Sequence, residues 1–367
     1  MISLPEPQAE LPIYSMDCAA EEIAHKLGLP RTPARDDIIT LLEARDTEEL
    51  FFAADRVRES CVGNAVHLRG IVEFSNHCLR NCLYCGLRRD NKALERYRMT
   101  GDEIVAAARE GAKAGIKTIV LQSGEDRYFT AQALAEIVIR LKSELDVAVT
   151  VSVGDRTKKD YKTLRQAGAD RYLLKHETAD SELFARLRPG TLLEDRKKRL
   201  GWLKELGFQV GSGNMVGLPG QSTATIADDI LLLKELDVEM AGIGPFIPHH
   251  GTPLAGYGEG DVALTLKTLA VTRLLLPHAN LPATTALATL HPEGRQLALR
   301  CGANVVMPDI TPVRYKKLYE IYPNKICVDE DGPAQSVRNI SGIIHQMGRS
   351  IAVDYGHGKR SRAQRSP

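Results

Sequence analysis

The pattern of apolar and polar residues divides the chain into a helical beginning and a longer stretch of alternating strands and helices. From about residue 14 to residue 62, apolar residues recur at helical spacing among charged ones. Leu41, Leu42, Leu50 and Phe51 follow this spacing, and Thr47 is followed by two glutamates, as at a helix start. We therefore expect residues 1–62 to form an N-terminal helical extension.

From His67 onward, short apolar runs rich in β-branched residues alternate with amphipathic helical segments. Strands that alternate with helices indicate an α/β fold with a parallel sheet. Eight such units close most economically into a (β/α)8 TIM barrel, which we expect over residues 63–350. The predicted strands are Val66–Phe74, Thr118–Gln122, Val147–Val153, Arg171–His176, Gln209–Val216, Met240–Phe246, Ala283–Ala288 and Asn304–Met307.

Capping signals mark several of the intervening helices. Thr100 and Glu103 have the spacing of a capping box, and another helix is expected to begin at Thr130. Gly168 and Gly207 follow helical runs, at positions where a C-cap glycine ends a helix. These boundaries leave room for one helix between successive predicted strands, as the barrel requires.

Polar or reactive side chains follow the predicted strands, and core packing does not explain them. In a (β/α)8 barrel, catalytic residues lie at the C-terminal ends of the strands. The sequence therefore predicts an active site at this end of the barrel. The segments concerned are Gln122–Asp126, Thr150–Ser152, Lys175–Glu177, Ser212–Met215 and Thr284–Thr285.

Composition narrows the environment of the protein. The 367 residues include 48 basic and 47 acidic side chains, so a net charge of +1 favours neither nucleic acid nor a membrane surface as a partner. No stretch approaches the ~18 apolar residues that span a bilayer, and residues 1–7 lack the features of a secretion signal. Seven cysteines, three of them within eight residues, do not indicate a disulfide framework, so we expect a cytoplasmic protein. Residues 351–367 are expected to form a C-terminal tail, in which the basic residues 358–367 lack large apolar side chains and are solvated.

The most informative motif is the C-x3-C-x2-C spacing of Cys78, Cys82 and Cys85. Four thiolates complete a [4Fe–4S] cluster, so three on one loop leave one iron free to bind another molecule. The alternative is a structural zinc site, which needs four ligands and would have to recruit His77 or the distant Cys327. Zinc signatures usually pair two C-x2-C halves, so the spacing favours a reactive cluster.

The motif, with Tyr84 directly before its last cysteine, resembles the signature of radical S-adenosylmethionine (SAM) enzymes, in which the methionine part of SAM chelates the free iron. Further strings over about residues 35–350 resemble the HydE family within that superfamily. Biotin synthase and methylornithine synthase share the layout but not the whole set of strings. The strings are Cys82–Asn91, Arg96–Thr100, Thr118–Asp126, Asp170–Thr178, Met215–Gln221, Gly242–His249, Pro282–Ala286 and Arg300–Asn304.

The resemblance implies a barrel of the radical SAM type and a role for each matching residue. Cys78, Cys82 and Cys85 would hold the [4Fe–4S] cluster. Gly124 and Glu125 would meet the amino group of SAM, and Arg196 would bind its carboxylate through the planar guanidinium. The residues implied in SAM binding are Tyr84, Gly124, Glu125, Ser152, Glu177, Arg196 and Met215.

A second set of positions is implied to line an interior substrate cavity. Hydroxyls and a cation in an enclosed space suit a small anionic ligand, because a buried charge needs pairing. Lys175 stands where arginine is expected in this family, which retains the charge but loses the fork geometry. The implied substrate residues are Gln122, Ser123, Thr150, Lys175, Thr284, Thr285, Met307 and Tyr319.

Some members of the family hold a second cluster near the C-terminus through three further cysteines. In this chain Cys327 is one of them, and Gln335 and Arg338 occupy the other two positions. We therefore expect no second cluster.

The resemblance implies reductive cleavage of SAM to a 5′-deoxyadenosyl radical in assembly of the [FeFe]-hydrogenase H-cluster. The substrate would be a small iron–cysteine species bearing CO and cyanide. Expected partners are a one-electron donor such as ferredoxin or flavodoxin, and the maturases HydG and HydF. The alternatives are an amino-acid-modifying enzyme of the methylornithine synthase or biotin synthase kind, and a non-catalytic iron–sulfur carrier or scaffold. A carrier would not need polar residues at successive strand ends.

Two motifs also have structural interpretations. In the structural interpretation of the first motif, Glu125 and Asp126 only cap the helix after the second strand. His249 and His250 follow the sixth strand, where they could ligate a metal or form part of the barrel rim.

Overall fold

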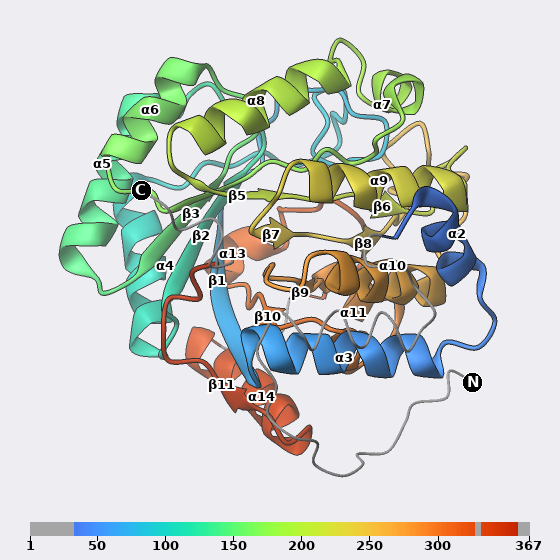
Figure 1. Cartoon of the computed structure of the whole chain (residues 1–367). Coiled ribbons are helices and arrows are strands. Elements are labelled where there is room, and N and C mark those ends of the chain that lie inside the picture. The colour runs from blue at the N-terminus through green and yellow to red at the C-terminus, as the bar shows by residue number, and fades with distance from the viewer. Residues whose placement is uncertain (1–32, 327–331, 359–367) are drawn as a thin grey trace.

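The structure is a computed structural model that describes residues 33–326 and 332–358 (Figure 1). Among the described residues, two helices, α2 (Arg35–Glu43) and α3 (Glu48–Val62), precede the first strand. The strands are β1 (Ala65–Ser75), β2 (Thr118–Ser123), β3 (Ala148–Ser152), β4 (Arg171–Leu173), β5 (Gln209–Ser212), β6 (Met215–Val216), β7 (Met240–Ala241), β8 (Gly244–Pro245), β9 (Pro282–Ala283), β10 (Val305–Val306) and β11 (Ser350–Ile351). The later helices are α4 (Gly101–Lys113), α5 (Ala131–Glu144), α6 (Lys158–Gln166), α7 (Ser181–Leu187), α8 (Leu193–Glu205), α9 (Thr223–Glu235), α10 (Val262–Leu275), α11 (Thr285–Leu290), α12 (Gly294–Arg300), α13 (Val313–Lys316) and α14 (Pro333–Gln346).

The strands form a parallel sheet that curls into a nearly closed barrel with helices around it (Figure 1). Hydrogen bonds join the strands in the order β7-β5-β4-β3-β2-β1-β10-β9. The last gap, between β7 and β9, is bridged where Met240 pairs with Asn280 and the Ala241 N–H donates to the Asn280 carbonyl at 3.1 Å. The predicted (β/α)8 barrel is therefore confirmed.

The described part of the N-terminal extension packs on one side of the barrel. Helix α3 lies against α10, and α2 lies against α9 and α10. An ion pair between Arg35 and Asp228, at 2.6 Å, ties α2 to α9. Helix α3 begins directly after Thr47, as the sequence predicts, whereas the expected helical residues 14–32 lie outside the described part of the chain.

Local helix signals agree with the structure. The Thr100 hydroxyl and the Glu103 carboxylate form the predicted capping box of α4, and the Thr130 hydroxyl caps α5. Gly168 and Gly207 follow α6 and α8 with φ of +101° and +80°, a conformation that glycine adopts without the strain a side chain would add.

Two predicted strands are each interrupted where their backbones meet. The run Gln209–Val216 divides into β5 and β6, and the run Met240–Phe246 divides into β7 and β8. A Cβ on Gly213 would lie 2.0 Å from the Gly242 carbonyl oxygen, so the two breaks face each other at a contact that only glycine permits. Strands β6 and β8 continue beyond the breaks as a separate parallel pair.

The predicted strand Ala283–Ala288 is wrong. Strand β9 ends at Ala283, and α11 begins at Thr285. Short apolar runs do not distinguish strand from helix by periodicity, and alanine and leucine in this run favour helix. Thr284 and Thr285 consequently lie at the start of a helix, still at the C-terminal end of the barrel.

The segment after β11 covers the N-terminal end of the barrel, so residues 352–358, which were expected to belong to the C-terminal tail, pack against the barrel instead. The Tyr355 carbonyl accepts hydrogen bonds from Thr118 at 2.9 Å and from Arg171 at 2.5 Å. The Gly356 carbonyl accepts one from Arg69 at 3.0 Å. These buried polar side chains point into the barrel from three strands, and the two carbonyls accept their hydrogen bonds, while the Nε atom of Arg69 has no partner among the described residues.

Candidate active site

The loop after β1 holds the three cysteines of the motif at the C-terminal end of the barrel. Cys82 is buried, and Cys78 and Cys85 are half-buried. The loop is fixed by Arg96, whose guanidinium donates to four backbone carbonyls between residues 76 and 91 at 2.5–3.1 Å. The positions of the thiols are thus set by the backbone of the loop.

The surroundings of the thiols suit a cluster. Burial raises the pKa of the Cys78 thiol to about 11 and raises that of Cys85 as well, so both thiolates need a positive charge nearby. The backbone N–H groups of Arg80 and Glu125 point at the Cys78 sulfur at 3.4 Å. Hydrogen bonds of this kind stabilise thiolates that ligate iron–sulfur clusters.

The spacing of the sulfurs also separates a cluster from zinc. Sulfurs around a single tetrahedral zinc lie about 3.8 Å apart, given zinc–sulfur bonds of about 2.3 Å. The sulfurs of the three cysteines do not all lie within 4.8 Å of one another. In residues 33–326 and 332–358, the group that brings three ligand atoms that close is His249, His250 and Glu320. Thiols on separate irons of a [4Fe–4S] cluster do not need that proximity, so the donor set fits a cluster.

Gly124 allows the end of β2 to approach the cluster loop. Its N–H donates to the Ser75 carbonyl at 3.1 Å. A Cβ at this position would lie 2.3 Å from the His77 carbonyl oxygen and 2.8 Å from the Cys78 Cβ. Any side chain here would push directly on the first cysteine.

We expect Gly124→Ala to displace the loop and to lower the iron bound after anaerobic reconstitution well below the wild-type amount. Overpacking of this kind costs about 1–3 kcal/mol of stability. We expect it to destabilise the cluster loop in particular, because the added Cβ would contact Cys78. The matched control is Gly201→Ala in α8, where an added Cβ meets nothing within 4 Å. Wild-type iron content in Gly124→Ala, measured by colorimetric iron and sulfide assays, would contradict this interpretation.

Glu125 is held in place by two arginines that the sequence analysis did not single out. Its carboxylate accepts a hydrogen bond from Arg80 at 2.6 Å and lies 3.7 Å from Arg188, which also donates to the Tyr84 hydroxyl at 2.9 Å. Gly154, at φ +71°, leaves space for it, because a Cβ there would lie 2.0 Å from the Glu125 Cγ. The oxygen facing Arg188 has no short hydrogen bond to that arginine and can accept one from an ammonium group.

Asp126 has a structural role in the same loop. It accepts hydrogen bonds from the Ser75 hydroxyl at 2.7 Å and from Arg98 at 2.6 Å. The cap of the following helix is Thr130, so the purely capping interpretation does not hold for Glu125 or Asp126.

The end of β4 brings a second set of charged groups to the site. Lys175 and Glu177 form an ion pair at 3.4 Å, and Glu177 has φ of +67°, an uncommon conformation for a non-glycine residue. Backbone strain of this kind is concentrated at functional sites. Arg196 donates to the Lys175 carbonyl at 2.9 Å and lies 3.3 Å from Asp155, so it stabilises the backbone at this strand end.

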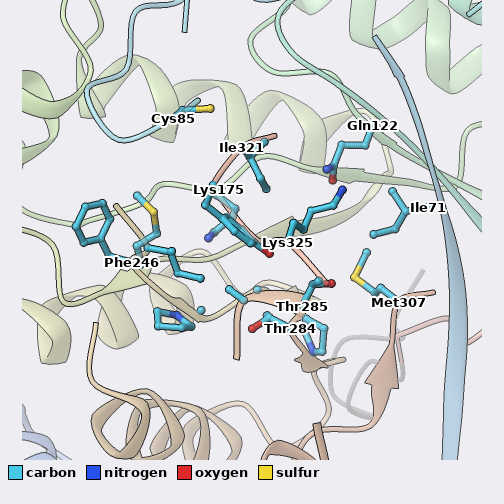
Figure 2. Close-up of a pocket in the computed structure, with 18 of the residues that line it drawn as sticks. Ile71, Cys85, Gln122, Lys175, Phe246, Thr284, Thr285, Met307, Ile321 and Lys325 are labelled. Carbon is cyan, nitrogen blue, oxygen red and sulfur yellow. The ribbon is translucent and has the colours of Figure 1, made fainter. Parts of the chain in front are cut away.

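A cavity of about 340 Å³ extends from the cluster loop into the barrel (Figure 2). In this view Cys85 lies at one end, Thr284 and Thr285 lie opposite, and Lys175 and Lys325 lie between them. The predicted residues that line the cavity are Tyr84, Cys85, Gln122, Lys175, Glu177, Met215, Thr284, Thr285 and Met307.

The remaining predicted residues surround the cavity without lining it. Gly124 and Glu125 contact the cluster loop, whereas Arg196 contacts the Lys175 carbonyl and Asp155. Ser152 ends β3 and pairs in register with Gln122. Tyr319 is buried next to Gln122, Ser123 donates to the Gly124 carbonyl, and the Thr150 hydroxyl is buried without a hydrogen-bond partner among the described residues.

The sequence analysis did not identify Glu73 and Asp309 in the cavity wall, or Lys325, which pairs with them. Lys325 donates to both oxygens of Glu73, at 2.6 and 2.5 Å, and lies 3.4 Å from Asp309. Burial and the neighbouring Asp309 raise the pKa of Glu73 to about 8, and Lys325 opposes that shift. The cavity therefore presents charges of both signs. An acid inside the apolar run of β1 is a signal that could have indicated Glu73, whereas nothing in the sequence indicates Lys325.

The histidine pair belongs to the rim of the barrel. The Gly251 N–H donates to His249 Nδ1 at 2.8 Å, so a neutral His249 carries its proton on Nε2. That nitrogen lies 3.7 Å from Glu320. A metal would need the same nitrogen unprotonated, so the geometry favours the rim interpretation over a metal site.

Comparison with known proteins places this site in a family. The profile of the radical SAM superfamily matches residues 72–233, from β1 to α9. The [FeFe] hydrogenase maturase subunit HydE of Thermotoga maritima is 53% identical over 313 residues, which cover 85% of this chain and 89% of that protein. The 3-methylornithine synthase of Methanosarcina acetivorans is 31% identical, over 74% of this chain and 78% of that protein.

A solved structure gives the same result for the fold. The crystal structure of methylornithine synthase (PylB) superposes with a TM-score of 0.79 at 27% identity, covering 92% of this chain and 97% of that one. The chain is therefore a radical SAM enzyme. Within that superfamily it belongs to the HydE family. The superfamily is defined by a [4Fe–4S] cluster and SAM, and the cysteine loop described above fits the cluster.

Proposed function

We propose that this protein cleaves SAM reductively and acts in the assembly of the [FeFe]-hydrogenase H-cluster. The observation that carries the proposal is the 53% identity to a HydE along 89% of that protein, together with a charged cavity directly below the cysteine loop. The chain presents no helix, among its described residues, that could cross a membrane. We propose a cytoplasmic location.

The chain's own residues would prepare the reaction in three ways. Cys78, Cys82 and Cys85 would hold a [4Fe–4S] cluster, which when bound supplies the electron that breaks a sulfur–carbon bond of SAM. Glu125, oriented by two arginines, would accept a hydrogen bond from the SAM ammonium group. The cavity inside the barrel would limit the access of water and orient the substrate toward Cys85, which lines one end of it.

The cavity would take a small charged substrate, for which we propose an iron–cysteine species bearing CO and cyanide. Lys175, with Thr284 and Thr285, would pair with the anionic part of the ligand. Glu73 and Asp309 offer carboxyl oxygens that would accept hydrogen bonds from a positively charged group beside Lys325. We propose HydG and HydF as partners in maturation, and a small redox protein as the electron donor.

An amino-acid-modifying reaction is the competing function. The 31% identity to 3-methylornithine synthase and a cavity with charges of both signs favour it over a carrier role. The test is an anaerobic maturation assay in which HydG, HydF and apo-hydrogenase are incubated with or without this protein. Hydrogen evolution that depends on this protein and on SAM is expected. Full activation in its absence, or none in its presence, would contradict the proposed function.

We further propose that the chain carries a single cluster. Cys327 lies outside the described residues, but Gln335 and Arg338 have no thiols, and Arg338 donates to the Gln335 side chain at 3.0 Å on the surface of α14. Reconstituted protein is expected to bind about four iron and four sulfide per chain. A Cys327→Ala variant is the control and is expected to bind the same amount. Six or more irons in the wild type, with a loss in Cys327→Ala, would contradict a single cluster.

A further inference from the structure

The segment around the cysteines carries more positive charge than the rest of the chain. Residues 76–98 contain six basic and two acidic side chains, a net charge of +4, whereas the whole chain has a net charge of +1. The excess is therefore local to the loop. A local field of this kind attracts acidic partners from solution.

Three of these six basic side chains pair with groups of the protein itself. Arg80 pairs with Glu125, Arg96 donates to backbone carbonyls of the loop, and Arg98 pairs with Asp126. The other three are Arg88, Arg89 and Lys92, which we call the basic face.

The basic face is open to solvent. The Arg89 side chain is 61% exposed, Lys92 is exposed and Arg88 is half-buried. The acid nearest to Arg89 is Asp90, at 3.2 Å, and an exposed ion pair of this kind is worth little. The positive charge of this face therefore remains available to a partner.

The backbone beneath the basic face is hydrogen-bonded to the cysteine loop. The Arg88 N–H donates to the Cys85 carbonyl at 3.0 Å, and the Arg89 N–H donates to the Arg80 carbonyl at 2.8 Å. The Arg80 N–H in turn points at the Cys78 sulfur at 3.4 Å. A short path of covalent and hydrogen bonds thus connects this surface with two of the three thiols.

The opposite side of the loop faces the substrate cavity. Tyr84 and Cys85 line that cavity, whereas the residues of the basic face do not. An electron delivered at the basic face would reach the cluster position without crossing the cavity in which the radical reaction takes place.

We propose that the basic face is the docking surface for a small acidic protein that carries one electron. The inference rests on the proposed function, because a radical SAM cluster must be reduced before it acts. In this step the carrier loses one electron and the cluster gains it, and no bond is made or broken. Charge complementarity would act mainly on the rate of association.

The test compares two charge reversals of equal size on reconstituted full-length protein. Arg89→Glu with Lys92→Glu changes the basic face, and Lys159→Glu with Lys162→Glu changes two exposed lysines on α6. The probe is flavodoxin hydroquinone, and the readout is bleaching of the cluster's visible absorbance in an anaerobic stopped-flow instrument. We expect the first variant to lower the second-order rate about tenfold at low ionic strength, less at high salt. We expect the control to match the wild type.

A small uncharged reductant separates docking from damage to the cluster. Photogenerated 5-deazariboflavin radical is expected to reduce both variants and the wild type equally. Equal flavodoxin rates in the two variants, or slower reduction of Arg89→Glu/Lys92→Glu by deazaflavin as well, would overturn the proposal. If the wild type is reduced but forms no 5′-deoxyadenosine with SAM, the proposed function fails while the docking result still stands.

Discussion

Cys85→Ala is expected to lower the iron bound on anaerobic reconstitution to background and to eliminate SAM cleavage. Cys85 would hold one iron of the cluster, and it is the cysteine of the motif that lines the cavity. Two remaining thiolates are too few to hold a four-iron cluster whose fourth iron is reserved for SAM. The measurements are iron content, visible absorbance and 5′-deoxyadenosine detected by mass spectrometry.

A buried thiol outside the motif provides the control for this prediction. Cys61 is 1% exposed in α3 and lies in the helical extension, away from the loop after β1. Cys61→Ala is expected to cost about 1 kcal/mol of stability through a small cavity and to keep its cluster and activity. A Cys85→Ala protein that retains a SAM-responsive cluster would show that another group supplies the third ligand.

Glu177→Gln is expected to weaken SAM binding by about 10- to 100-fold, because a charged hydrogen bond contributes roughly 1.5–3 kcal/mol. The substitution keeps the size of the side chain, and the backbone at φ +67° accommodates either residue equally. It removes the negative charge at the end of β4 and leaves Lys175 without its partner at 3.4 Å. The measurement is isothermal titration calorimetry of SAM binding to the reconstituted protein.

The control is Glu182→Gln on the exposed side of α7, which removes the same charge five residues further along the chain. It is expected to bind SAM as the wild type does. Equal affinities in the Glu177 and Glu182 variants would remove Glu177 from the SAM site and leave the Lys175 ion pair as a structural contact.

The barrel could be predicted from the sequence because its signals are local. Strand β1, the capping box of α4 and the glycines after α6 and α8 each depend on a few neighbouring residues. Strand β9 could not, because Ala283–Ala288 has too few residues for its periodicity to separate helix from strand. The break at Gly213 could not be predicted either, since it depends on contact with Gly242, a residue distant in sequence.

The same distinction applies to the site. The cysteines and Tyr84 form one motif, and half of the residues implied by the resemblance line the cavity. The residues that orient them come from elsewhere in the chain, such as Arg80 and Arg188 around Glu125. Lys325 lies 252 residues from Glu73, so no local pattern could pair them. The sequence predicts a cavity that binds an anionic ligand, whereas the structure shows both basic and acidic side chains in its wall.

The proposed function depends most directly on a cluster that binds SAM and cleaves it. The decisive measurement is EPR spectroscopy of the anaerobically reconstituted, reduced protein with and without SAM, combined with analysis of the products. We predict the signal of a reduced [4Fe–4S] cluster that changes when SAM is added, and formation of 5′-deoxyadenosine and methionine. A signal unchanged by SAM, with neither product formed, would contradict the central claim.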